Sequence, residues 1–340
     1  MKKKTLLIGA FLLLFAISLT GCGKSTASPT TSNVTDKANA SDIAKEPYEI
    51  KLATQTGETD VLIADQLGYF KDENITVKYV GVLPPSQAIP AVLKGDLTFT
   101  LGHADMLGKA ILAGSKLKAI STGMVDDPQY NHLIYFVKKG SSIKTAKDLI
   151  GKKIGVPFTG SCPDGLFLEW LKQNNVSKDQ VQFVVIPEAQ EELALQNGLV
   201  DVTAHHPATY QGVKNHGKSD VLVTTWDISK DPNAGTSFSA ITSEKFLQEN
   251  PDVAKGIVRA LTRAHHWINA NRDEGKKITA KALNMKEEDV AAFYYDDNDY
   301  IVDSRIEPWF KMIESFGDLK PGQLKPSDIY TNDYNPYFKK

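Results

Sequence analysis

Hydrophobic and polar residues follow two different periods along most of this chain. Residues 49–53 alternate between polar and apolar side chains, as half-buried β-strands do, whereas residues 61–67 repeat their apolar positions at helical spacing. Further strands are predicted at residues 75–80 and 97–101, and further helices at residues 87–93 and 104–113. Strands and helices that alternate in this way, with turn residues between them, are typical of an α/β fold with a parallel sheet.

The same succession starts again after residue 150, and the chain beyond residue 246 is mostly helical. We therefore predict an α/β protein of two lobes, each with a doubly wound and mainly parallel sheet. Lobe 1 comprises residues 47–140 and 227–340, including the C-terminal helices, and lobe 2 comprises residues 141–226. Two crossover segments, near residues 135–142 and 226–238, join the lobes. The cleft between two such lobes is a common place for a ligand.

The N-terminus carries a targeting pattern. Three lysines precede an apolar stretch, residues 6–19, that is too short to span a bilayer and is typical of a signal peptide. The sequence Leu19-Thr20-Gly21-Cys22 resembles the bacterial lipobox, which implies cleavage after residue 21 and lipidation of Cys22. We expect residues 1–21 to be a signal peptide and residues 22–46, rich in Ser, Thr and Ala, to be a flexible linker.

A lipid on Cys22 would anchor the protein at the cell membrane, on its extracytoplasmic face. A plain N-terminal anchor with a chance cysteine is the alternative. No membrane-spanning segment is needed for the first of these arrangements.

Composition narrows the function classes. Lys and Arg together number 39 against 41 Asp and Glu, so no surplus of positive charge favours a nucleic-acid partner. The chain has only two cysteines, Cys22 and Cys162, and no CxxC pair, which excludes a multi-disulfide scaffold and a cysteine-rich zinc motif. With 41% hydrophobic and 24% charged residues, the composition is that of a globular protein.

Five short segments carry a more specific signal. They are residues 68–75 (GYFKDENI), 93–97 (LKGDL), 148–156 (DLIGKKIGV), 195–201 (LQNGLVD) and 246–253 (FLQENPDV). In this order they resemble the substrate-binding proteins of bacterial ABC importers of the nitrate, sulfonate and taurine type. The resemblance implies a type II periplasmic-binding fold, a monomer that closes around one small-molecule ligand, and docking on a membrane permease with its ATPase. It leaves the ligand open among nitrate, bicarbonate, sulfonates, taurine, and aromatic or pyrimidine compounds.

Candidate ligand-binding residues follow from the fold. In a parallel sheet, ligands lie beyond the carboxyl ends of the strands and against helix N-termini. This rule selects five loops, and their polar residues are the candidates: Gln55, Thr56, Ser86, Gln87, His103, Asp105, Ser161, Cys162, His205 and His206. The loop at Ser161 is the strongest candidate anion cradle, because Gly160 and Ser161 precede a proline that suits the first helical position.

Each candidate also has a structural alternative. Ser161 and Asp105 suit ordinary helix caps, and a lone cysteine such as Cys162 is usually inert. Four histidines with Cys162 suggest a metal site, namely His103, His132, His205 and His206. They lack metal-ligand spacing, however, and we expect no metal and no cofactor. Adjacent His205 and His206 at a strand end point to opposite faces, so at most one enters the cleft.

We therefore predict an extracytoplasmic solute-binding component of an ABC importer, which captures a small anion and delivers it to a permease. The chain is not expected to be an enzyme, because it lacks GxSxG, P-loop and dinucleotide motifs. It also lacks the cysteine-rich motif of the related enzymes that make the thiamine pyrimidine. Two alternatives remain: a receptor for a pyrimidine thiamine precursor or another aromatic compound, and a metal-scavenging lipoprotein that uses its histidines and cysteine.

Overall fold

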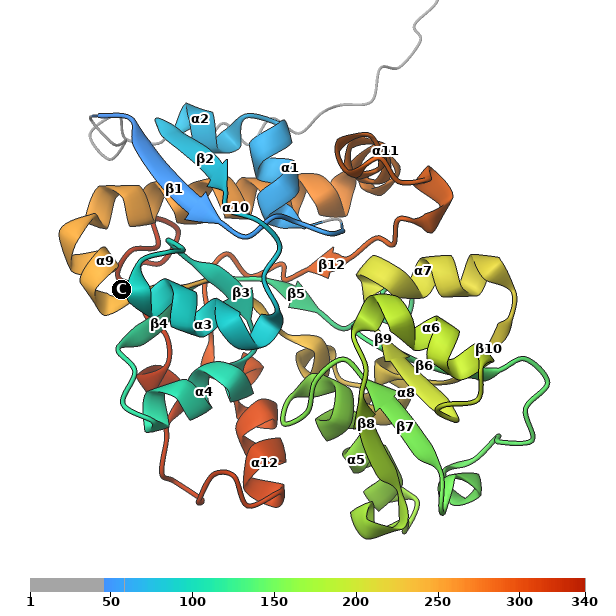
Figure 1. Ribbon diagram of the computed structural model, residues 1–340. Helices are drawn as coiled ribbons and strands as arrows, with labels where there is room; N and C mark the ends of the chain where they lie inside the picture. The colour runs from blue at the N-terminus through green and yellow to red at the C-terminus, as the bar shows by residue number, and fades with distance from the viewer. Residues whose placement is uncertain (1–45, 58, 340) are drawn as a thin grey trace, which may run out of the picture. The chain divides into compact units, whose positions relative to one another are not determined.

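The computed structural model describes residues 46–57 and 59–339 (Figure 1). The predicted signal peptide, the predicted lipidation site Cys22 and nearly all of the predicted linker lie outside these residues. Within the described part of the chain, no helix combines the length and the apolar character that crossing a membrane requires.

Strands and helices alternate through most of the described chain. The first elements are β1 (Tyr48–Leu52), α1 (Asp60–Gln66), α2 (Tyr69–Asp72), β2 (Ile75–Tyr79), α3 (Pro85–Lys94), β3 (Thr100–Gly102), α4 (Ala104–Leu112), β4 (Leu117–Thr122) and β5 (Met124–Val125). They are followed by β6 (Ile134–Lys138), β7 (Lys153–Val156), α5 (Cys162–Gln173), β8 (Gln182–Val185), α6 (Glu188–Gln196), β9 (Val202–His205), α7 (Pro207–His216) and β10 (Ser219–Thr224). The remaining elements are α8 (Thr225–Ser229), β11 (Phe238–Ser243), α9 (Glu244–Glu249), α10 (Pro251–Ala270), α11 (Arg272–Leu283), β12 (Tyr294–Tyr295) and α12 (Glu307–Ser315).

One group of strands is built on β1, β2, β3, β4 and β11. β1 pairs in parallel with β2, and β11 pairs antiparallel with both β3 and β4. The backbone amide of Thr98 donates to the carbonyl of Lys51 at 2.8 Å, which links β1 to the segment that enters β3. Helix α10 buries Ile257 and Leu261 in one core with Ile50 of β1. The apolar side of this helix therefore packs against the strands.

The second group is a five-stranded sheet in the order β10-β6-β9-β7-β8. β7 runs parallel to β8 and β9, whereas β6 runs antiparallel to β9 and β10. β10, β9, β7 and β8 therefore run in one direction and β6 runs against them, in agreement with the predicted mainly parallel sheet. In the first group, β11 likewise runs against β3 and β4.

The first crossover also differs from the expected position. β6 is paired on both sides within the five-stranded sheet, although the sequence pattern assigned residues up to 140 to lobe 1. Tyr135 and Phe136 are both completely buried, so this strand lacks the polar alternation that would have identified it. We accordingly propose that the chain passes between the lobes before Ile134, through residues 126–133, and returns through residues 225–237.

The two connections are fixed to each other. The backbone amide of Asp126 donates to the carbonyl of Pro232 at 2.9 Å, and that of Ser237 donates to the carbonyl of Met124 at 2.9 Å. A Cβ atom on Gly235 would lie only 2.7 Å from the Cβ of His132, so the two segments touch at a position where only glycine fits. If the two groups of strands move relative to each other, the backbone of these two connecting segments has to bend.

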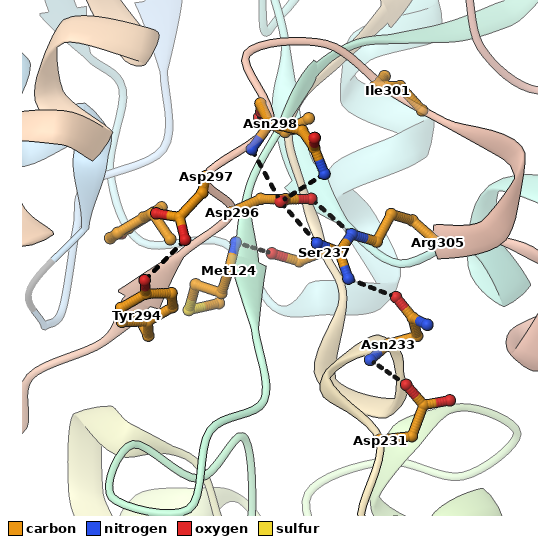
Figure 2. A network of polar contacts seen from close by, with 12 residues as sticks. Met124, Asp231, Asn233, Ser237, Tyr294, Asp296, Asp297, Asn298, Ile301 and Arg305 are labelled. Atoms are coloured by element: carbon orange, nitrogen blue, oxygen red, sulfur yellow. Dashed lines mark hydrogen bonds and ion pairs between the residues drawn. The ribbon is translucent and has the colours of Figure 1, made fainter.

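An arginine from the C-terminal part of the chain, Arg305, forms hydrogen bonds in the same region (Figure 2). Arg305 donates through Nε to Oδ2 of Asp296 at 2.7 Å, and through Nη1 to Oδ1 of Asn233 at 2.6 Å. Asp296 is almost completely buried, whereas Arg305 keeps 19% of its side chain exposed. The guanidinium is therefore the counter-charge for a carboxylate that water does not reach.

Replacing Arg305 with methionine should leave the Asp296 carboxylate buried and uncompensated. We expect the free energy of unfolding to fall by about 3 kcal/mol, measured by urea denaturation. The matched control is Lys277→Met, which breaks an exposed pair with Glu274 and should change stability by less than about 1 kcal/mol. Equal effects of the two substitutions would contradict this account.

Candidate functional site

Strand ends from both groups meet around one cavity of about 310 Å³. Residues 52–57 after β1 and residues 99–103 around β3 line it from one side. Phe158 after β7, Glu188 at the start of α6 and residues 206–208 after β9 line it from the other. The cavity therefore lies at the carboxyl ends of strands in both groups, where α/β proteins commonly bind ligands.

Half of the sequence-predicted residues line this cavity. They are Gln55, Thr56, His103, Ser161 and His206. Ser86 and Gln87 do not line it: they lie exposed on the first turn of α3, and their neighbours Pro85 and Ala88 reach the cavity instead. Asp105, Cys162 and His205 are completely or almost completely buried and do not appear on its wall. Ligand contact by the lining residues remains a prediction.

Two lining residues escaped the sequence analysis. Glu188 opens α6 directly after β8, so the strand-end rule would have selected it had it been applied to that loop as well. His132 lies in the first connection, just before β6, and was considered only as a metal candidate. The strand-end rule does not select His132, because this residue does not follow a strand of the sheet and is placed at the cavity by the path of the connection.

His103 and His132 pack together at the cavity wall. Their ring centroids lie 4.7 Å apart, edge to face, and His103 also stacks on Trp309 at 4.8 Å. Nδ1 of His103 lies 2.9 Å from the carbonyl of Thr236, which can only accept, so Nδ1 carries the proton and Nε2 is an acceptor. Burial lowers the pKa of His103 and lowers that of His132 further, which keeps both rings neutral.

His206 is held by a carboxylate. Its backbone amide donates to Glu188 at 2.8 Å, and its Nδ1 lies 3.1 Å from the other oxygen of the same group. Burial alone would raise the pKa of Glu188, but the His206 ring and the hydrogen bonds to this carboxyl outweigh it and lower the pKa to about 2. Glu188 is therefore ionised and only accepts, so Nδ1 of His206 donates to it.

Cys162 lies next to this histidine. Its Sγ is 3.5 Å from Nε2 of His206, and its side chain is completely buried. Burial, and secondarily the charge of Asp105, raises the pKa of the thiol well above its ordinary value. A neutral, buried thiol is the opposite of the exposed thiolate that nucleophilic cysteines require.

The loop at Ser161 was expected to be the strongest anion cradle, and the structure corrects this expectation. The backbone amides of Gly160 and Ser161 both donate to the Asp164 carboxylate, at 2.8 and 3.1 Å. The carbonyl of Gly160 accepts from Lys109 at 2.7 Å. The chain's own carboxylate therefore occupies the position that an external anion would take, and only the side chain of Ser161 is left to face the cavity.

Two other helices begin at the cavity. The N-cap residue of α4 is His103 and that of α7 is His206, and neither side chain accepts a hydrogen bond from its helix. The positive ends of both helix dipoles therefore reach the cavity wall, and at α7 the Glu188 carboxylate already accepts from the backbone amide of the N-cap residue. The residues that line the cavity include neither lysine nor arginine.

His205 faces away from the cavity, as expected for one of two adjacent residues at a strand end. It packs beside Glu191, with Nε2 3.8 Å from Oε2, and both side chains are buried. Burial raises the pKa of Glu191 to about 10, and burial lowers that of His205 to about 4. Both groups are therefore neutral at pH 7, and they pack between β9 and α6, away from the cavity.

The buried Glu191 predicts a pH dependence of stability. Its carboxyl keeps its proton in the folded protein up to about pH 10 but loses it near pH 4.5 when unfolded, so this group's contribution falls as pH rises between these values. Glu191→Gln replaces the ionisable group and therefore removes this loss of stability at high pH. Its stability relative to the wild type should grow between pH 6 and 9, by up to about 1.4 kcal/mol per pH unit, in urea titrations. Glu274→Gln, at an exposed position, should show no such trend; parallel profiles for all three proteins would refute the assignment.

The sequence matches one known protein family. A family model described as NMT1/THI5 like matches residues 55–275, which is more than half of the chain. The matched range begins in the loop after β1 and ends in α11, so it includes every predicted ligand-binding residue.

Curated relatives include both a binding protein and an enzyme. A protein of Brucella abortus named as a binding protein is 26% identical over 204 residues, and the match covers 56% of this chain. The chain spans only 63% of the length of that relative. The 4-amino-5-hydroxymethyl-2-methylpyrimidine phosphate synthase of Candida albicans is 24% identical over 294 residues, covering 81% of this chain and 83% of the enzyme.

Solved structures share the fold. The alkanesulfonate-binding protein of Xanthomonas axonopodis pv. citri, bound to MOPS, superposes with a TM-score of 0.68. The two proteins are 16% identical, and the match covers 84% of this chain and 98% of the other. This likeness confirms the predicted fold class.

Proposed function

Because the chain belongs to the NMT1/THI5-like family, we propose that it is the extracytoplasmic solute-binding component of an ABC importer. In this proposal the cavity captures one small anion, such as a sulfonate, taurine or nitrate. The protein acts as a monomer, is anchored to the membrane through a lipid on Cys22, and delivers its ligand to a permease that an ATPase drives. Both the family and the fold likeness favour this class of receptor.

The observation that carries the proposal is the composition of the cavity wall. Residues from both groups of strands line it, and in the described part of the chain the connections through residues 126–133 and 225–237 join these groups. A ligand there would contact both lobes at once only when they are closed, and would therefore stabilise the closed state. Gly57 and Ala208 mark the contact between the lobes, since a Cβ atom on Gly57 would lie 3.0 Å from the Cβ of Ala208.

The N-termini of α4 and α7 support an anionic ligand. Each places the positive end of its dipole at the cavity. The related Xanthomonas structure is that of an alkanesulfonate-binding protein, which is consistent with this ligand class.

The cysteine argues for binding rather than catalysis. Cys162 is the one buried free cysteine in the described chain, and burial holds its thiol neutral. We propose that the protein releases its ligand unchanged. The likeness to the Candida albicans synthase makes an enzyme the alternative. The binding experiment therefore includes a test for turnover of each ligand.

An aromatic ligand is the second candidate. Phe99, Phe158 and Phe293 all line the cavity, and their rings would suit a flat heterocycle such as a pyrimidine. The relative from Candida albicans is named as a pyrimidine phosphate synthase.

A thermal-shift panel with the purified protein tests these ligands together. It contains nitrate, bicarbonate, taurine, short alkanesulfonates, aromatic carboxylates and aminopyrimidines, and each mixture is analysed for products afterwards. A ligand at ~1,000 times its Kd adds about 4 kcal/mol, which should raise Tm by several degrees. We expect a shift with one anion class and no product. A shift with pyrimidines alone would favour the second candidate, and product formation would replace the receptor with an enzyme.

Closure predicts the effect of a wedge at the contact between the lobes. Gly57→Val should push against Ala208 and weaken binding of the stabilising anion at least ~10-fold, without replacing any polar residue of the cavity. Gly212→Val is the control, since a Cβ there has open space around it, and its Kd should stay within about twofold of the wild type. Unchanged affinity in Gly57→Val, measured by calorimetry, would contradict closure at this contact.

A further inference from the structure

The side chains that line the cavity provide little positive charge for an anion. No lysine or arginine lines it, Glu188 on its wall is ionised, and Nε2 of His103 is an acceptor. His206 is paired with Glu188, so these two residues together offer no net positive charge. A stronger positive charge has to come from outside the side chains that line the cavity.

We propose that His103, His132 and Cys162 bind one divalent transition-metal ion of the zinc class at the base of the cavity, and that this ion's open coordination position receives the anion. The metal site stands on the geometry of these three side chains. Its role toward the anion rests on the function proposed above.

The three donors are close enough to share an ion. One nitrogen of each histidine and the sulfur of Cys162 all lie within 4.8 Å of one another. Tetrahedral zinc with bonds of about 2.0 Å to nitrogen and 2.3 Å to sulfur holds its ligands about 3.3–3.7 Å apart, so side-chain rotations that move the atoms about 1 Å would complete the site. Two imidazoles and one thiolate suit zinc-class ions and disfavour magnesium and calcium, which prefer oxygen.

The ligand atoms are prepared for coordination. The carbonyl of Thr236 fixes the proton of His103 on Nδ1, which leaves Nε2 free to bind a metal. Neither ring nitrogen of His132 has a hydrogen-bond partner, although only 4% of the residue's surface is exposed. A metal would replace the proton of the Cys162 thiol, and this proton would be released on binding. Nε2 of His206 lies 3.5 Å from the sulfur.

An unpartnered carboxyl group beside the cluster points the same way. Asp105 is completely buried, and neither of its oxygens has a hydrogen-bond partner. Its charge acts on both His103 and Cys162, so it lies near the proposed ligands. Leaving a carboxyl and an imidazole buried without partners costs stability, and a nearby divalent cation would offset both costs.

The proposed ligands also lie where the lobes are joined. His132 belongs to the first connection, the carbonyl that orients His103 belongs to the second, and Cys162 begins α5 of the other lobe. One ion at this point would tie both connections to α5. Metal binding would therefore favour the arrangement in which the cavity walls face each other.

Titration of the metal-free protein with Zn²⁺, and separately with Co²⁺ and Mg²⁺, tests the site. We expect one Zn²⁺ per chain by calorimetry, no binding of Mg²⁺, and a thiolate-to-cobalt charge-transfer band in the near ultraviolet. Cys162→Ser should abolish this band, and His132→Phe should weaken Zn²⁺ binding about 100-fold or more, since even outer-shell groups contribute 10–100-fold. Because the His132 nitrogens have no partners, phenylalanine should keep the fold, as circular dichroism and Tm will report.

The control is His216→Phe, the same substitution at an exposed histidine that pairs with Glu192, and its affinity for Zn²⁺ should match the wild type. Equal losses in both variants, or a Co²⁺ spectrum without the thiolate band, would overturn the site. The anion identified by thermal shift is then titrated with and without Zn²⁺. Binding at least ~10-fold tighter with zinc supports the coupling. If the affinity for the anion is the same with and without zinc, the coupling is overturned and the proposed receptor function stands. If the protein binds zinc but responds to no anion or pyrimidine, the proposed receptor function is overturned and the metal site stands.

Discussion

The need to compensate buried polar groups is the constraint on which this site depends. His103 meets it through a backbone carbonyl, and His206 meets it through an ionised glutamate that several donors hold. His132 and Asp105 do not meet it with any partner in the described chain. Such groups destabilise a fold unless something else offsets them, and the metal ion proposed above would offset the cost of both.

The fold supplies the setting for this chemistry. Two groups of strands present their carboxyl ends to one cavity, and two connections that hydrogen-bond to each other join the groups. Arg305 and Asp296 brace the same region from the C-terminal part of the chain (Figure 2). In the proposed receptor, ligand capture at the cavity would be linked to motion at the connections, because the polar cluster touches both. This linkage is what a receptor needs in order to report that its ligand is bound.

Much of this architecture could be predicted from the sequence, and the failures have physical causes. The resemblance to nitrate, sulfonate and taurine binding proteins, together with the α/β alternation, gave the correct family and fold class. β6 was misassigned because a strand buried on both faces has no polar alternation. The Ser161 loop was misread because Asp164, one turn later, fills it, and a sequence pattern does not reveal which acceptor wins. His132 reaches the cavity only through the path of the connection, which depends on contacts far apart in sequence.

The most direct test of the account is a crystal structure of the protein grown with Zn²⁺ and the anion that stabilises it, with anomalous diffraction recorded at the zinc edge. The account predicts one anomalous peak at bonding distance, about 2.0–2.3 Å, from His103, His132 and Cys162. The anion should lie in the same cavity, bound to that ion and contacted by residues of both groups of strands. An anion bound outside the cavity, or one held there by protein groups alone with no zinc peak, would contradict it.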